Sequence, residues 1–149
     1  MKHNNQQHTG SRVLLGIADI ELQKTIRETL EIQDYEVLVA DNARDAVRTL
    51  RTHAPKVVIL EVALPFHQGN FEYDGIDPLE VITDVDPFLP VMLLAPENVT
   101  IDHASALMAD MIVRIPVPKD ELLENLETLL SETLRQRSLR KSAQLAILQ

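Results

Sequence analysis

The 149-residue sequence contains no cysteine or tryptophan, and it has only four glycines and five aromatic residues. Without cysteine the chain can form neither a disulfide nor a thiolate metal site. The glycines, at positions 10, 16, 69 and 75, are too few and too scattered for a dinucleotide-binding fingerprint or a glycine-rich phosphate loop. The composition therefore argues against nucleotide binding, and we expect no cofactor.

Metal-binding and nucleophile motifs are missing as well. The five histidines form no pair at ligand spacing on one helix. No serine stands in the sharp strand-to-helix context that a hydrolase nucleophile requires. We therefore expect that the protein is not an enzyme and binds no metal.

Apolar runs are short. Asp, Glu, Arg or Pro interrupts each of them well before the roughly 18 residues that a membrane-spanning helix needs. The first ten residues, MKHNNQQHTG, are polar and lack the apolar core of a signal peptide. We expect a soluble, cytoplasmic protein with no membrane span.

Charge is unevenly distributed along the chain, whose net charge is −9. Residues 1–130 hold 10 basic and 22 acidic side chains, whereas residues 131–149 hold four basic and one acidic. An acidic body repels phosphate backbones, so only the basic tail could attract nucleic acid. We expect no nucleic-acid partner.

The length suits a single domain. We expect a disordered N-terminal tail over residues 1–11, one domain over 12–130 and a helical extension over 131–149. Short apolar segments that are typical of buried strands alternate with segments of helical period. The predicted strands cover residues 13–17, 35–40, 57–60, 90–94 and 111–115.

This alternation predicts an α/β fold with a five-stranded parallel sheet, doubly wound with helices on both faces. Helix-start signals agree, with Asp19 before the first helix, Asp41 or Asn42 before the second, and Asp77 followed by proline before the third. In such folds the functional crevice lies beyond the carboxyl ends of the strands, where the strand order reverses. We expect the order 2-1-3-4-5 and a crevice between the first and third strands. The residues predicted to border it are Ile17, Ala18, Asp19, Glu61, Ala95 and Val117.

Several short motifs occur in a characteristic order: YEV at 35–37, APKVVILE at 54–61, LP at 64–65, DG at 74–75, PV at 90–91 and IPVP at 115–118. With the order of the predicted elements, they make the segment from Arg12 to about Leu130 resemble the receiver domain of bacterial response regulators. The resemblance implies a flavodoxin-like fold and a role in two-component signalling or a phosphorelay.

The resemblance also implies that the phosphorylation site is degenerate. The family's acidic metal-binding pair falls on Ile17 and Ala18, and its phosphoacceptor aspartate falls on Glu61. Its strand-four hydroxyl residue falls on Ala95 and its lysine on Val117, while its aromatic switch residue falls on Arg114. These departures suggest an atypical pseudo-receiver without the phosphoacceptor aspartate.

Phosphoryl transfer to a carboxylate requires a divalent cation and a cationic side chain near the transferred oxygens. Asp19 would occupy the second position of the acidic pair only if the correspondence with the family shifted by one residue in the first helix. It is therefore the one carboxylate that could remain from this pair. Glu61 could mimic a phosphorylated aspartate. We favour a solvated glutamate at a strand end, because Ala95 and Val117 offer no group to read the mimic.

The loop after Glu61 is six residues longer than the loop that the resemblance implies. It carries Phe66, His67, Phe71 and Tyr73, and aromatic residues are common at interaction surfaces. We predict that Phe66 or Phe71 covers the aliphatic crevice and that the other aromatic residues of the loop contact a partner.

The last predicted helix begins near Lys119, and no proline or glycine follows before Gln149. A helix of about 30 residues would be about 45 Å long, longer than the domain is wide. We predict an overhanging helix that binds a partner helix, a second copy or an anionic surface through residues such as Leu134, Arg135 and Leu139. The alternative is a frayed tail.

Three functional hypotheses follow. The first is a phosphorylation-independent, receiver-like signalling module that acts through protein-protein interaction, with a homodimer through the C-terminal helix. The alternative is a receiver that retains unconventional phosphate or metal binding at Asp19 and Glu61. The third is a small-ligand-binding domain of the same fold.

Overall fold

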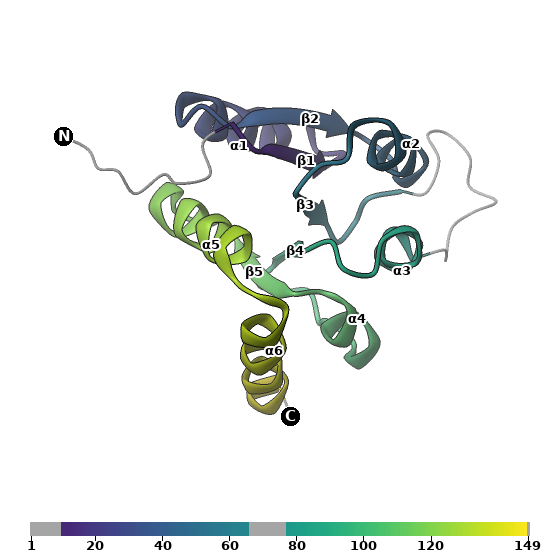
Figure 1. Cartoon of the computed structure of the whole chain (residues 1–149), viewed down its shortest axis with the longest axis vertical. Helices are drawn as coiled ribbons and strands as arrows, with labels where there is room; N and C mark the ends of the chain where they lie inside the picture. Colours follow the sequence, from purple (N-terminus) through teal and green to yellow (C-terminus); the bar gives the residue numbers. More distant parts are fainter. Residues whose placement is uncertain (1–9, 66–76, 149) are drawn as a thin grey trace.

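The computed structural model describes residues 10–65 and 77–148 (Figure 1). Within these ranges, strands and helices alternate along the chain until an additional helix follows the last unit. The elements are β1 (Arg12–Gly16), α1 (Ile20–Ile32), β2 (Glu36–Ala40), α2 (Ala43–His53), β3 (Val57–Glu61), α3 (Pro78–Val85), β4 (Val91–Pro96), α4 (His103–Met108), β5 (Met111–Ile115), α5 (Lys119–Ser131) and α6 (Leu134–Leu148). The five predicted strands are confirmed, with their ends shifted by at most two residues.

The strands form one parallel sheet in the order β2-β1-β3-β4-β5, as predicted. Figure 1 shows α1 and α5 on one face of this sheet and α2, α3 and α4 on the other. The doubly wound α/β fold is therefore confirmed. The strand order reverses between β1 and β3, so the crevice lies where the topology predicts it.

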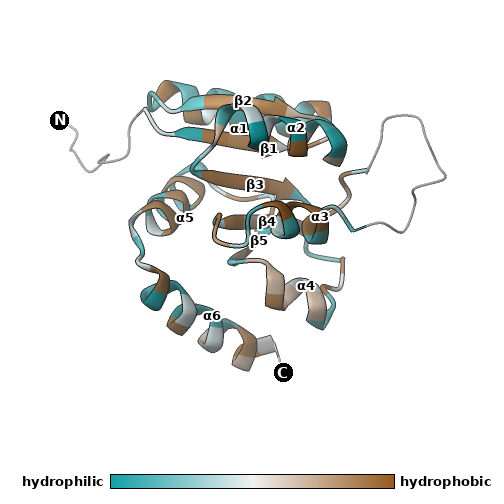
Figure 2. Cartoon of the chain, turned by 45° about the vertical axis from the view of Figure 1, so that its right-hand side comes forward, coloured by the Kyte–Doolittle hydropathy of each residue, from teal (hydrophilic) through white to brown (hydrophobic). Residues whose placement is uncertain are grey.

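The strands are apolar throughout because both faces of the sheet are covered. Val13 and Leu15 pack toward α1 and α5, whereas Leu14 between them packs toward α2 and α3. Figure 2 shows this apolar character along the strands, with polar residues on the outer sides of the helices. A continuous apolar run is the pattern expected for a parallel sheet buried on both faces.

Side-chain caps fix the starts of the helices. Asp19 caps α1 by accepting a hydrogen bond from Leu22 N at 3.0 Å. Asn42, rather than Asp41, caps α2, and Asp77 caps α3 with proline in the first turn. These three starts agree with the sequence signals.

The prediction of one long overhanging helix at the C-terminus is wrong. Helix α5 ends at Ser131, and α6 begins two residues later. Thr133 Oγ1 accepts a hydrogen bond from Gln136 N at 3.1 Å, and Gln136 Oε1 accepts one from Thr133 N at 2.9 Å. This reciprocal capping box starts a new helix and lets the chain change direction without proline or glycine. The T-x-x-Q pattern at residues 133–136 is the local sequence signal for this break.

Helix α6 folds back beside β5 and α4 instead of extending into solvent (Figures 1 and 2). Neither of the two apolar core clusters includes a residue of α6. Among the described helices, none is long and apolar enough to cross a membrane.

Candidate functional site

The crevice at the carboxyl ends of β1, β3 and β4 is lined by aliphatic groups where the resemblance implies polar ones. Ile17 is fully buried, and its N–H donates to Ala40 O at 3.0 Å. Ala95 at the end of β4 is also fully buried, and Ala18 is half-buried. The structure therefore brings these predicted positions together, and none of their side chains can bind an ion.

Glu61, the last residue of β3, is held in this crevice by hydrogen bonds. Its Oε1 accepts from Ala18 N at 2.8 Å and from Asp19 N at 3.3 Å. These N–H groups lie at the start of α1, where the helix dipole favours a negative charge. The half-buried Glu61 thus differs from the solvated glutamate expected from the sequence, because its carboxylate links β3 to the start of α1.

Asp19 is exposed and already serves as the cap of α1. Beside it, Gln23 Nε2 donates to Ile17 O at 2.8 Å. Among the described residues, no three histidine, aspartate or glutamate side chains gather closely enough to hold a metal ion. The aliphatic Ile17 and Ala18 at the acidic-pair positions do not fit the divalent cation that the resemblance implies.

The fifth strand supplies no cationic side chain to the crevice at the position assigned to lysine. Strand β5 ends at Ile115, so Val117 lies two residues beyond it, packed against the core cluster on the α1 and α5 side. Both Ile115-Pro116 and Val117-Pro118 are residue-proline pairs, and both put an aliphatic side chain before proline. Whichever of Ile115 and Val117 is aligned with the lysine of the family, the side chain at that position is aliphatic and carries no charge.

Arg114, at the position assigned to the aromatic switch residue, has a structural role. Its Nη1 donates to Pro96 O at 2.8 Å and to Val99 O at 2.6 Å. The side chain thereby fastens the connection between β4 and α4 to β5. The sequence comparison could locate this position but could not reveal that contact.

The proposed interaction loop cannot be placed in this geometry. Phe66, His67, Phe71 and Tyr73 lie outside the described residues, so the prediction that a ring covers the crevice stays a prediction.

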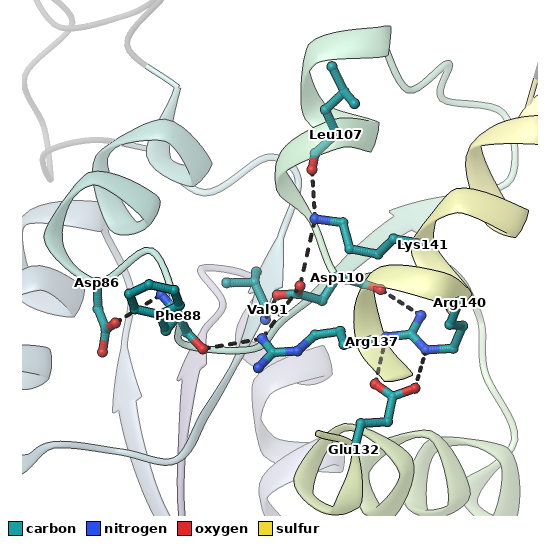
Figure 3. Close-up of polar contacts among 9 residues, drawn as sticks. All are labelled: Asp86, Phe88, Val91, Leu107, Asp110, Glu132, Arg137, Arg140 and Lys141. Atoms are coloured by element: carbon teal, nitrogen blue, oxygen red, sulfur yellow. Dashed lines mark hydrogen bonds and ion pairs between the residues drawn. The ribbon is translucent and has the colours of Figure 1, made fainter. Parts of the chain in front are cut away.

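A second polar cluster, which sequence reasoning missed, joins α6 to the start of β5 (Figure 3). The buried Asp110 lies 3.5 Å from Arg137 and 3.7 Å from Lys141, and its Oδ2 accepts from Val91 N at 2.7 Å. Arg137 also donates to Phe88 O at 3.2 Å, and Lys141 to Leu107 O at 2.7 Å. We call Asp110, Arg137 and Lys141 the Asp110 cluster.

Arg140 adds a neighbouring attachment. Its guanidinium binds both carboxylate oxygens of Glu132, at 2.6 and 3.0 Å, and donates to Asp110 O at 2.6 Å. Arg137, Arg140 and Lys141 of the tail therefore face the domain's own polar groups. By contrast, the predicted tail residues Leu134 and Leu139 are 56% and 63% exposed, and Arg135 is also exposed.

Two titratable groups outside the crevice have shifted pKa values. Burial raises the pKa of the Tyr35 phenol above its usual range, and a hydrogen bond to Glu127 adds to this effect. The pKa of Asp102, which caps α4, is lowered by the hydrogen bond from the backbone N–H of Ser105. Neither group lies among the crevice residues named above, so both shifts follow from local structure.

Comparisons with known proteins agree with this architecture. The model of the response regulator receiver domain family matches residues 18–127. The chain is 28% identical over 128 residues to the probable transcriptional regulatory protein TcrX of Mycobacterium tuberculosis. This match covers 83% of this chain and 52% of that protein. The chain is also 27% identical over 107 residues to the chemotaxis protein CheY of Bacillus subtilis. This match covers 69% of this chain and 83% of that protein.

A solved structure supports the same fold. The receiver domain of sensor histidine kinase PA1611 from Pseudomonas aeruginosa PAO1, which has a magnesium ion in its active-site cleft, superposes with a TM-score of 0.69. The two are 20% identical, and the match covers 83% of this chain and 99% of that one. The chain spans about half the length of the first transcriptional regulators that it matches. With the family match extending over most of the sequence, the chain belongs to the response regulator receiver domain family.

Proposed function

We propose that this chain is a receiver-type signalling domain that acts by binding protein partners and does so without being phosphorylated. The observation that carries the proposal is the environment of Glu61. The resemblance assigns this residue to the phosphoacceptor position, and its Oε1 accepts hydrogen bonds from Ala18 N and Asp19 N.

The surrounding residues lack the groups that phosphoryl transfer uses. The reaction needs an in-line nucleophile, a divalent cation and a positive charge near the transferred oxygens. Ile17, Ala18 and Ala95 supply neither metal ligands nor a hydroxyl group. Glu61 is one methylene longer than aspartate, and a misplacement of about 1 Å can cost about a hundredfold in rate.

The fold offers a function that does not need this chemistry. Receiver domains of two-component signalling work with partner proteins, and this chain keeps the complete sheet and its five covering helices. The partners we propose are signalling proteins such as kinases or effectors.

Incubating the full chain with acetyl phosphate and Mg²⁺ and measuring its intact mass tests the proposal. We expect no added phosphate, while a receiver domain with a complete acidic pair, treated in parallel, gains one. Glu61→Gln is the matched control and keeps the size of the side chain. A phosphate adduct that appears on the native chain and disappears in Glu61→Gln would overturn the proposal and support phosphate binding at Asp19 and Glu61.

A further inference from the structure

A groove runs along β5, the outer strand of the sheet, and has a volume of about 670 Å³. Residues 111–114 of β5 form its floor. One wall includes Glu121 and Asn125 of α5, and the other includes Ala143 and Gln144 of α6. None of the crevice positions Ile17, Ala18, Glu61 and Ala95 lines this groove.

The backbone of β5 has unused hydrogen-bonding groups on the groove side. Leu94 O accepts from Val62 N, so the backbone N–H and C=O groups of Leu94 point toward β3. The backbone groups of the residues on either side of Leu94 therefore point toward β5. Val113 stands opposite Leu94 and, in a parallel ladder, bonds to the residues on either side of it. The alternation then directs the N–H and C=O groups of Ile112 and Arg114 outward, away from β4.

At one end of this edge, α6 already supplies a partner. Arg140 Nη1 donates to Asp110 O at 2.6 Å, just before β5 begins. In the part of the chain that the structure describes, the next strand residues have only β4 as a neighbouring strand. An open strand edge of this kind is a template for pairing with another extended chain.

Gln144 provides a second, independent indication. Its Nε2 is buried and has no hydrogen-bond partner among the described residues, although Gln144 lines the groove. A buried donor without a partner is unfavourable, because it has lost its hydration without compensation. Because Gln144 lines the groove, a turn of its side chain would bring this amide to a backbone carbonyl of a strand lying there.

The charges lining the groove favour a basic side chain in the bound segment. Glu97 and Glu121 line it, and neither takes part in any of the ion pairs found among the described residues. Two arginines also line the groove: Arg140 is paired with Glu132 at 2.6 Å, which largely compensates its charge, and Arg114 directs its Nη1 to Pro96 O and Val99 O. The two glutamates therefore leave the lining with a small negative excess. The chain as a whole carries a net charge of −9, which also attracts a basic partner.

We propose that this groove binds an extended, basic peptide segment of a partner protein, which adds a sixth strand at β5. Backbone hydrogen bonds to Ile112 and Arg114 provide the attachment, as in other complexes formed by strand addition. At about 3.3 Å per residue, the exposed edge accommodates a segment of about three to five residues. The proposal deepens the protein-binding part of the proposed function and rests on it.

Selection of a phage-displayed library of random linear heptapeptides on the full chain provides the probes. The strongest peptide is synthesised, its affinity is measured by fluorescence anisotropy, and its site is located from ¹⁵N amide shifts. We expect selected peptides to contain Lys or Arg, to bind in the micromolar range and to shift the amides of Ile112 and Arg114.

Three variants distinguish strand addition from other modes of binding. Ile112→Pro removes an outward N–H that does not pair with β4, and we expect binding at least tenfold weaker. Gln144→Leu removes the buried donor and should weaken binding severalfold. Ser142→Ala, at an exposed position of α6 that does not line the groove, is the control and should leave the affinity unchanged.

The proposal is overturned if no peptide is enriched, if the selected peptides bind Ile112→Pro as tightly as the native chain, or if the amide shifts fall elsewhere. Should Ile112→Pro fail to fold, Gln144→Leu and the amide shifts on the native chain decide. The acetyl phosphate experiment is independent, because it measures only whether the chain gains the mass of a phosphate group and whether Glu61→Gln abolishes that gain. Failure of the groove and failure of phosphorylation independence are therefore separable.

Discussion

The crevice at Glu61 and the Asp110 cluster lie in different parts of one fold and have opposite chemistry. At the crevice, the positions that the resemblance assigns to metal binding carry Ile17 and Ala18. At the start of β5, a buried aspartate, two arginines and a lysine join α6 to the domain. Among the described residues, the buried charges Asp110 and Arg137 therefore lie where the additional helix attaches, rather than in the crevice to which the resemblance assigns phosphoryl chemistry.

Replacing Asp110 should have the largest effect on stability. Asp110→Ala leaves Arg137, which is only 8% exposed, beside an empty site and removes the acceptor of Val91 N. Breaking a buried ion pair from one side costs about 3 to 5 kcal/mol. Urea unfolding measures this loss, with the exposed Asp84→Ala as the matched control.

An unchanged midpoint in Asp110→Ala would mean that the Asp110 cluster does not stabilise the fold. The contrast between the two regions would then be one of composition only.

Truncation after Ser131 should have a smaller effect. The truncated chain should still fold, because neither core cluster includes a residue of α6. We expect a loss of about 2 kcal/mol, since Asp110 loses its partners but gains access to water. In the truncated chain Asp110→Ala should then cost much less than in the full chain, because the interacting groups are already gone.

Additive losses from the truncation and Asp110→Ala would contradict this coupling.

Light scattering on the full chain and on the chain truncated after Ser131 also tests the predicted homodimer. Self-association through α6 stays a prediction, now based on the exposed Leu134 and Leu139 rather than on an overhanging helix.

The strands and most helix starts could be predicted because their signals are local. Val57–Glu61 is a continuous apolar run closed by one charge, and Asp77-Pro78 is a complete start signal within two residues. The parallel sheet then follows from the alternation of strands and helices. These features depend on neighbours in the sequence, which a single sequence displays.

The attachments of α6 could not be predicted in the same way. Arg137 and Asp110 are 27 positions apart, and nothing in the sequence pairs them until the break at Thr133 turns α6 back. The bonds from Ala18 and Asp19 to Glu61 likewise span more than 40 positions. The resemblance assigns Glu61 to the phosphoacceptor position, but only the fold shows that its carboxylate binds the start of α1.

Removing the carboxylate of Glu61 should have a modest effect on stability. Glu61→Ala leaves the N–H groups of Ala18 and Asp19 without their acceptor, a loss comparable to that of a helix cap. We expect about 1 kcal/mol of destabilisation. Glu28→Ala, at an exposed position within α1, is the control for urea unfolding.

A larger loss in Glu61→Ala than in Asp110→Ala would reverse the ranking of the two regions. It would make the crevice the more tightly organised of the two.

The smallest effect concerns acid and the cap of α4, the helix whose Leu107 carbonyl receives Lys141. The pKa of Asp102 is lowered from its ordinary 3.8 by the hydrogen bond from Ser105 N, so the folded state favours the ionised carboxyl. Its contribution to stability is therefore present above about pH 4 and is lost as the pH falls through the lower folded pKa. A side-chain NMR titration should place the midpoint of Asp102 below its ordinary 3.8. Asp102→Asn, which keeps an oxygen acceptor, should flatten the acid dependence of stability slightly, and a midpoint for Asp102 at or above 3.8 would contradict the prediction.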